Sequence, residues 1–109
     1  MILYHGTDRR NLGSILSKGL LKSDFEGGVY LTDTAESAVA WTAIRVAAKG
    51  GSEILVCEVE IDENNLQLGC DHSPVMQEVF GCGESYVHKG DIPTECIKNY
   101  TVYGTKKNV

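Results

Sequence analysis

Residues 54–61, ILVCEVEI, form the most regular stretch of the sequence and decide how the rest of the chain must fold. Successive side chains of an extended backbone point to opposite sides. One face of this stretch would carry Leu55, Cys57, Val59 and Ile61, and the other would carry Ile54, Val56, Glu58 and Glu60. Apolar residues on both faces predict a buried β-strand. We interpret the two glutamates as a solvated part of that strand.

Two helices are predicted upstream of this strand. Asp8 can cap a helix that Gly19 ends. Asp33 or Thr34 can cap a second helix, which the glycines at 50–51 end. Apolar residues at helical spacing are Leu12, Ile15 and Leu16 in the first helix, and Ala38, Trp41, Ile44, Val46 and Ala48 in the second.

Shorter apolar and β-branched runs predict the remaining strands. They lie at residues 2–4, 29–32, 86–88 and 97–103, whereas residues 62–83 are predicted to be irregular. Helices and strands follow one another without regular alternation. This order favours an α+β fold over a doubly wound parallel sheet.

The composition indicates one compact domain over residues 1–109. Of these residues, 42% are hydrophobic and 23% are charged, which excludes intrinsic disorder. No apolar run reaches the roughly 18 residues of a membrane helix. The first residues contain no basic start followed by a signal-peptide apolar stretch. We therefore expect a monomeric, cytoplasmic protein with no membrane partner.

The charge balance limits the partners. Ten Lys and Arg against 15 Asp and Glu give a net charge of −5. The densest basic positions are only 9–10 and 106–107. Non-specific nucleic-acid binding depends on clustered basic residues and counterion release. A nucleic-acid substrate would therefore have to be gripped locally.

The four cysteines, Cys57, Cys70, Cys82 and Cys96, are spaced widely and include no C-x-x-C pair. Structural zinc sites usually bring ligands two to four residues apart. A site that combines Cys70 and Cys82 with His72 is the alternative. We expect reduced thiols, with Cys57 in the core, and no metal.

Three short segments are candidates for chemistry. Residues 4–7, YHGT, lie where a strand ends and a helix begins, a place where main-chain groups can contact a ligand. Residues 28–32, GVYLT, would alone be an ordinary strand. In residues 83–87, GESYV, Glu84 opens a strand directly after a glycine.

Taken together and in this order, the segments resemble the ADP-ribosyltransferase superfamily, in the branch whose triad is His, Tyr and Glu. The chain is also similar to RNA 2′-phosphotransferases and to DNA-targeting ADP-ribosyltransferase toxins. The resemblance rests on LYHGT at 3–7, VYLT at 29–32, ESYV at 84–87 and IPTECI at 92–97. It implies a minimal ADP-ribosyltransferase-like fold, with split, curved antiparallel sheets, two main helices and a central cleft for NAD.

The resemblance also implies how NAD, the co-substrate, would be bound. Tyr30 would stack on the cationic nicotinamide ring. The main chain of Gly6 would pair with the carboxamide, and His5 with Thr7 would hold the adenosine-side ribose. Leu31 belongs to the same block as Tyr30 and completes the expected binding set.

The resemblance implies that the catalytic residues are Glu84, His5 and Tyr30. Glu84 would accept a hydrogen bond from the ribose 2′-hydroxyl and stabilise the positive charge that grows as nicotinamide leaves. Glu78 is the nearest preceding carboxylate and is the alternative catalytic group. No metal is required.

The function implied is NAD-dependent mono-ADP-ribosyl transfer to a macromolecular acceptor. Protein and nucleic acid both remain open as acceptors. A phage or mobile-element effector that acts in a host cytoplasm would suit the size and the fold. The alternatives are an enzyme similar to RNA 2′-phosphotransferases, which the acidic net charge disfavours, and a non-catalytic inhibitor module.

Overall fold

The structure, a computed structural model, describes residues 1–21, 28–68 and 85–104. Within these residues the chain forms a six-stranded antiparallel sheet and two α-helices, so the α+β prediction is confirmed. The strands are β1 (Ile2–Asp8), β2 (Gly28–Thr32), β3 (Glu53–Glu60), β4 (Leu66–Leu68), β5 (Ser85–Lys89) and β6 (Ile97–Gly104). The α-helices are α1 (Leu12–Lys18) and α2 (Ala35–Ala48), and the short 3₁₀ helices are Arg9–Asn11, Glu63–Asn65 and Thr94–Cys96.

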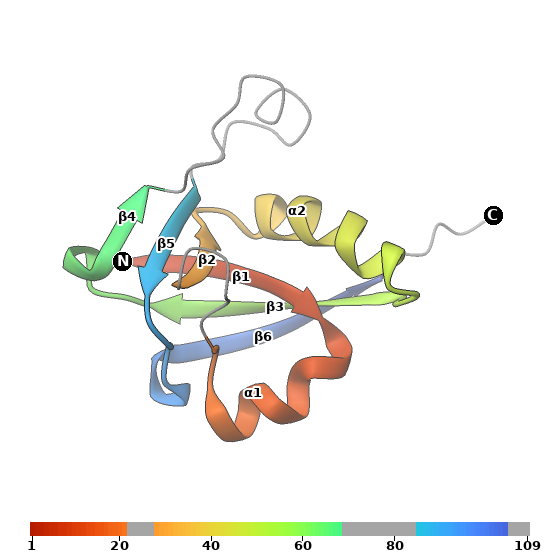
Figure 1. The fold of residues 1–109 in the computed structure, drawn as a ribbon, viewed down its shortest axis with the longest axis horizontal. Coiled ribbons are helices and arrows are strands. Elements are labelled where there is room, and N and C mark those ends of the chain that lie inside the picture. Colours follow the sequence, from red (N-terminus) through yellow and green to blue (C-terminus); the bar gives the residue numbers. More distant parts are fainter. Residues whose placement is uncertain (22–27, 69–84, 105–109) are drawn as a thin grey trace.

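Strand β3 separates two apolar cores, as its alternating pattern predicts. Leu55, Cys57 and Val59 lie in the core on the α1 side of the sheet. Ile54 and Val56 lie in a smaller core on the α2 side. The two helices thus cover opposite faces of the sheet, α2 above and α1 below in Figure 1.

The strand order is β4-β5-β2-β1-β3-β6, so the sheet consists of two halves that meet between β2 and β1. Figure 1 shows β1, β3 and β6 running nearly horizontally and β4, β5 and β2 standing steeply across them. Split sheets were the expectation from the resemblance. The structure instead joins the halves into one sheet, because Tyr4 of β1 pairs with Thr32 of β2.

Helix α2 has the predicted ends, whereas α1 has only its predicted end at Gly19, because it begins at Leu12 and not directly after Asp8. Both helices bury fewer apolar residues than predicted. Gly19 ends α1 with a φ of 78°, and the Thr34 hydroxyl caps α2 by accepting a hydrogen bond from the Ser37 amide at 3.1 Å. Leu16 and Ile44, however, are 55% and 63% exposed. Each lies on the outer side of a helix whose opposite side packs against the sheet.

Two strands differ from the prediction. β1 extends to Asp8 rather than ending at Tyr4. β4 lies within the stretch predicted to be irregular. The rest of that stretch, including Cys70, His72 and Glu78, lies outside the described residues.

Across residues 1–21, 28–68 and 85–104, no helix is long and apolar enough to cross a membrane.

Candidate functional site

Five of the predicted site residues lie on the two strands at which the halves of the sheet join: His5, Gly6 and Thr7 on β1, and Tyr30 and Leu31 on β2. Strands β1 and β2 pair at Tyr4 and Thr32. The residues of β1 that follow Tyr4 are not paired with β2. On its other side, β1 pairs with β3 from Ile2 to Asp8. We call residues 5–7 of β1 and 30–31 of β2 the β1–β2 junction.

The hydrogen-bond alternation of β1 determines which main-chain groups face this junction. The Ile61 amide donates to the Met1 carbonyl at 2.9 Å, and the Met1 amino group donates to the Ile61 carbonyl at 3.0 Å. In an antiparallel ladder, such hydrogen-bonded pairs alternate with pairs whose N–H and C=O groups point away from the partner strand. Odd-numbered residues of β1 therefore direct these groups toward β3. Even-numbered residues of β1 therefore direct their N–H and C=O toward β2. For Gly6 both groups lie beyond the last pair of the β1–β2 ladder.

His5 connects β1 to β2 through its side chain where the main-chain pairing stops. Its Nδ1 lies 2.8 Å from the Tyr30 carbonyl oxygen, and because a carbonyl only accepts, Nδ1 carries the proton. Burial lowers the pKa of the imidazole below 6.5, and the Arg45 charge lowers it further against the opposing effect of the Tyr30 hydrogen bond. The ring is therefore neutral at pH 7, and its Nε2 is a hydrogen-bond acceptor.

The rings of His5 and Tyr30 lie on opposite faces of the sheet, although one cleft was expected to hold both. His5 is in register with Cys57, which belongs to the core on the α1 side. Tyr30 alternates with two residues of that core, so its ring lies on the α2 side. There it approaches Trp41, with ring centroids 6.1 Å apart and planes inclined by 54°. The link between His5 and Tyr30 runs through the Tyr30 main chain.

Gly6 is required by helix α2. A Cβ at this position would lie 2.2 Å from the Thr42 hydroxyl oxygen and 2.6 Å from the Ala38 carbonyl oxygen. Real side chains do not approach so closely, so the helix can pack here only against glycine. The sequence suggested a ligand as the reason for this glycine. In the structure, helix α2 and not a ligand approaches Gly6 on this face of the sheet. The N–H and C=O of Gly6 point toward the junction.

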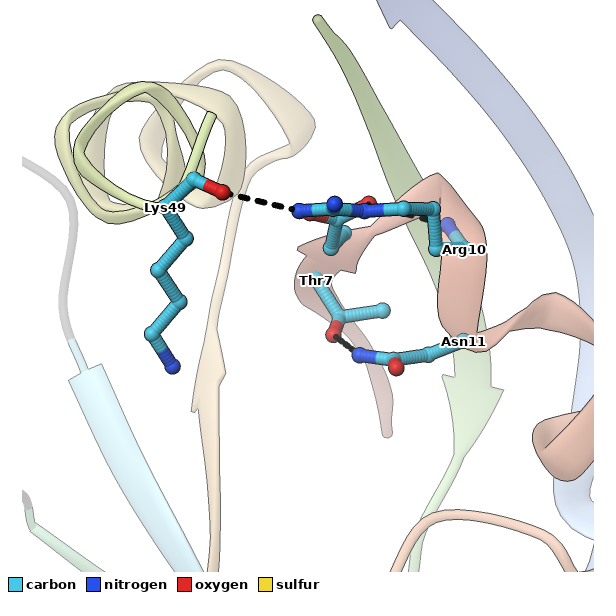
Figure 2. A network of polar contacts seen from close by, with 5 residues as sticks. Thr7, Arg10, Asn11 and Lys49 are labelled. Atoms are coloured by element: carbon cyan, nitrogen blue, oxygen red, sulfur yellow. Dashed lines mark hydrogen bonds and ion pairs between the residues drawn. The ribbon is translucent and has the colours of Figure 1, made fainter. Parts of the chain in front are cut away.

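Thr7 follows on the same face as His5, since its register partner Leu55 also lies in the core on the α1 side. The Asn11 side-chain amide donates to the Thr7 hydroxyl oxygen at 2.9 Å (Figure 2). The hydroxyl keeps its own proton for donation to another group. Next to it, Arg10 donates to the Lys49 carbonyl at 3.3 Å and ties the end of β1 to the end of α2.

Asp8 anchors the same network. Its carboxylate accepts hydrogen bonds from the Arg10 side chain and from the Arg10 amide at 2.9 Å. These bonds hold the pKa of the Asp8 carboxyl below its usual 3.8. The cap expected from the sequence therefore exists, but it opens the 3₁₀ turn that precedes α1 rather than α1 itself.

Leu31 occupies the core rather than an open site. Its side chain is 0% exposed and belongs to the cluster on the α1 side. A ligand at the junction cannot contact this side chain without displacing the core. The binding role expected for Leu31 would therefore have to use its main chain.

Glu84 lies outside the described residues, so its position relative to the other site residues is not part of this geometry. The residue that follows it, Ser85, begins β5 and is in register with Thr32. Thr32 in turn pairs with Tyr4. In the described parts of the chain, no group of three or more His, Cys, Asp or Glu side chains could hold a metal ion.

Two residues at the site were not singled out from the sequence. Trp41 contacts the Tyr30 ring, and Arg45 lowers the pKa of His5. Trp41 was assigned only to the apolar side of a helix, and Arg45 to no role. Both belong to α2, and only the packing of α2 against β1 and β2 reveals their proximity to the junction.

Comparisons of the sequence with known proteins found no relative. No protein-family model matches the sequence, and no curated protein matches it.

Proposed function

We propose that the β1–β2 junction binds NAD and that the protein transfers ADP-ribose from it to a macromolecular acceptor. The observation that carries the proposal is the hydrogen bond from His5 Nδ1 to the Tyr30 carbonyl at 2.8 Å. It spans the position where main-chain pairing stops and turns Nε2 of a neutral imidazole into an acceptor. Sugar hydroxyls are donors of the kind that such a nitrogen binds.

The two faces of the junction suit the two halves of a dinucleotide. His5 and Thr7 share the face on the α1 side, where an acceptor nitrogen and a hydroxyl can bind the adenosine-side ribose. The Tyr30 ring lies on the α2 side, where its π-face can stack on cationic nicotinamide. Gly6, between them, directs one donor and one acceptor toward the junction, which is what a carboxamide needs.

The chemistry proposed is substitution at the anomeric carbon of the nicotinamide ribose. The bond between the anomeric carbon and the pyridinium nitrogen breaks, and nicotinamide leaves with the bonding electron pair as a neutral pyridine. The acceptor nucleophile forms the new bond to the anomeric carbon and releases its proton to solvent. The transition state resembles an oxocarbenium ion, as in glycoside hydrolysis. We assign the stabilisation of that positive charge to Glu84, the residue that directly precedes β5.

Replacing Glu84 with Gln tests the reaction. Glu84→Gln keeps the size and one acceptor but removes the charge, so nicotinamide release should fall by about 10²–10³-fold. The affinity for NAD should change far less, because the charge acts mainly in the transition state. Nicotinamide release and the mass of candidate protein, DNA and RNA acceptors, measured after incubation with NAD, provide the readouts.

Glu78→Gln is the matched control and should retain activity. An inactive Glu78→Gln beside an active Glu84→Gln would move the catalytic carboxylate to Glu78. Full activity in both variants would remove the carboxylate from the mechanism. An RNA 2′-phosphate as the sole acceptor modified would favour the RNA 2′-phosphotransferase alternative. No nicotinamide release from the wild type with any acceptor would contradict the enzyme proposal.

A further inference from the structure

Trp41 is an aromatic residue of α2 that the proposed NAD contacts do not use. Its ring centroid lies 6.1 Å from that of Tyr30, and the two planes are inclined by 54°. Aromatic pairs favour tilted or offset arrangements at this spacing over a face-to-face sandwich. Both residues are half-buried, so the pair lies at the border between core and surface.

The main chain of Tyr30 is fixed independently of its ring. β2 pairs with β5, with Tyr30 opposite Val87, and the Tyr30 carbonyl accepts the His5 hydrogen bond. The side-chain torsions of Tyr30 are not determined by these main-chain contacts. Because Trp41 contacts the ring, it restricts those torsions.

Trp41 is itself held at a set height above the sheet. Thr42, the next residue, lies with Ala38 so close to Gly6 that no Cβ fits between α2 and β1. At its start, α2 is fixed by the Thr34 cap. The support behind the Tyr30 ring is therefore a helix with little freedom to move away from the junction.

We propose that Trp41 is a positioning residue, which holds the Tyr30 ring in the orientation that stacks on nicotinamide. This inference rests on the proposed binding of NAD at the junction. Trp41 contributes no group to the reaction itself. Its loss should therefore weaken the binding of NAD and leave the chemical step nearly unchanged.

The test compares the kinetics of nicotinamide release in Trp41→Leu, Trp41→Phe and the control Ile44→Ala. Leu preserves much of the apolar volume but removes the aromatic ring, so KM for NAD should rise about three- to tenfold, with kcat within about twofold. Phe restores a smaller ring and should recover most of the affinity. Ile44 is 63% exposed on the same helix, and its replacement should change neither constant.

Fluorescence gives a second readout, because Trp41 is the single tryptophan of the chain. In the wild type, NAD should change this fluorescence saturably, and Tyr30→Ala should shift the midpoint to higher NAD. Melting temperatures establish that each variant is folded. If the wild type is active and Trp41→Leu has the same KM for NAD, the positioning role alone is overturned. A lower kcat and melting temperature in Trp41→Leu without a change in KM would overturn it as well. A wild type that neither binds nor cleaves NAD would overturn the proposed function and this role with it.

Discussion

At the scale of single residues, the two nitrogens of His5 have different surroundings. Nδ1 donates to the Tyr30 carbonyl, and this bond selects the tautomer whose Nε2 accepts. Burial and the Arg45 charge both oppose protonation of the ring. The neutral ring is therefore the form that the fold favours at pH 7.

The lowered pKa of His5 predicts a pH dependence of stability. An unfolded chain takes up a proton near pH 6.5, while the folded chain does so only at lower pH. The contribution of neutral His5 to the free energy of unfolding is therefore fully present above pH 6.5. It is lost as the pH falls through the pKa that His5 has in the folded chain. The free energy of unfolding should decrease by up to about 1.4 kcal/mol for each pH unit in that window.

Denaturant unfolding at several pH values between 7.5 and 5 measures this dependence. His5→Gln retains an amide donor for the Tyr30 carbonyl but cannot titrate, so its unfolding free energy should vary less with pH than that of the wild type. Equal slopes in the wild type and His5→Gln would contradict the assignment.

At the scale of elements, the packing of α2 against β1 depends on Gly6. Gly6→Ala would force a methyl group to within 2.6 Å of the Ala38 carbonyl oxygen, which is part of the helix backbone and cannot rotate away. We expect a loss of about 1–3 kcal/mol in the free energy of unfolding, measured by chemical denaturation. Gly13→Ala is the control.

Gly13 lies in α1, and a Cβ there would meet nothing within 4 Å. Alanine has the higher helix propensity, so Gly13→Ala should leave stability unchanged or raise it by up to about 1 kcal/mol. A Gly6→Ala variant as stable as Gly13→Ala would show that α2 does not press on β1.

The sequence predicts elements best where one local signal acts alone. The alternation of β3, the end of the first helix at Gly19 and the cap at Asp33 or Thr34 each depend on neighbouring residues. The first two are confirmed, and of the two cap candidates the structure uses Thr34. β1 was predicted too short because Gly6, Thr7 and Asp8 resemble a turn by propensity. In the structure they pair with β3 along their whole length, and tertiary pairing overrides that propensity.

At the scale of the whole molecule, the junction exists because the two halves of the sheet cross each other and are joined only by the pairing of β1 with β2 (Figure 1). Strand order and crossing angle are not encoded in any local motif. His5 and Tyr30 are identified as site residues from their motifs, but their hydrogen bond joins residues 25 positions apart in the chain. It depends on the placement of β1 against β3 and of β2 against β5, which no local motif encodes. The placement of their rings on opposite faces followed from the same register.

Thermal unfolding with and without NAD shows whether NAD binds at the β1–β2 junction. A ligand at ten times its Kd adds about 1.4 kcal/mol to the folded state, which raises the melting temperature of a domain of this size by about 5 °C. We predict such a shift for the wild type, a much smaller one for Tyr30→Ala, and an unchanged one for Tyr100→Ala, a half-buried tyrosine of β6. An absence of any shift at millimolar NAD would show that the protein does not bind NAD, and equal shifts in the two tyrosine variants would show that NAD does not bind at this junction.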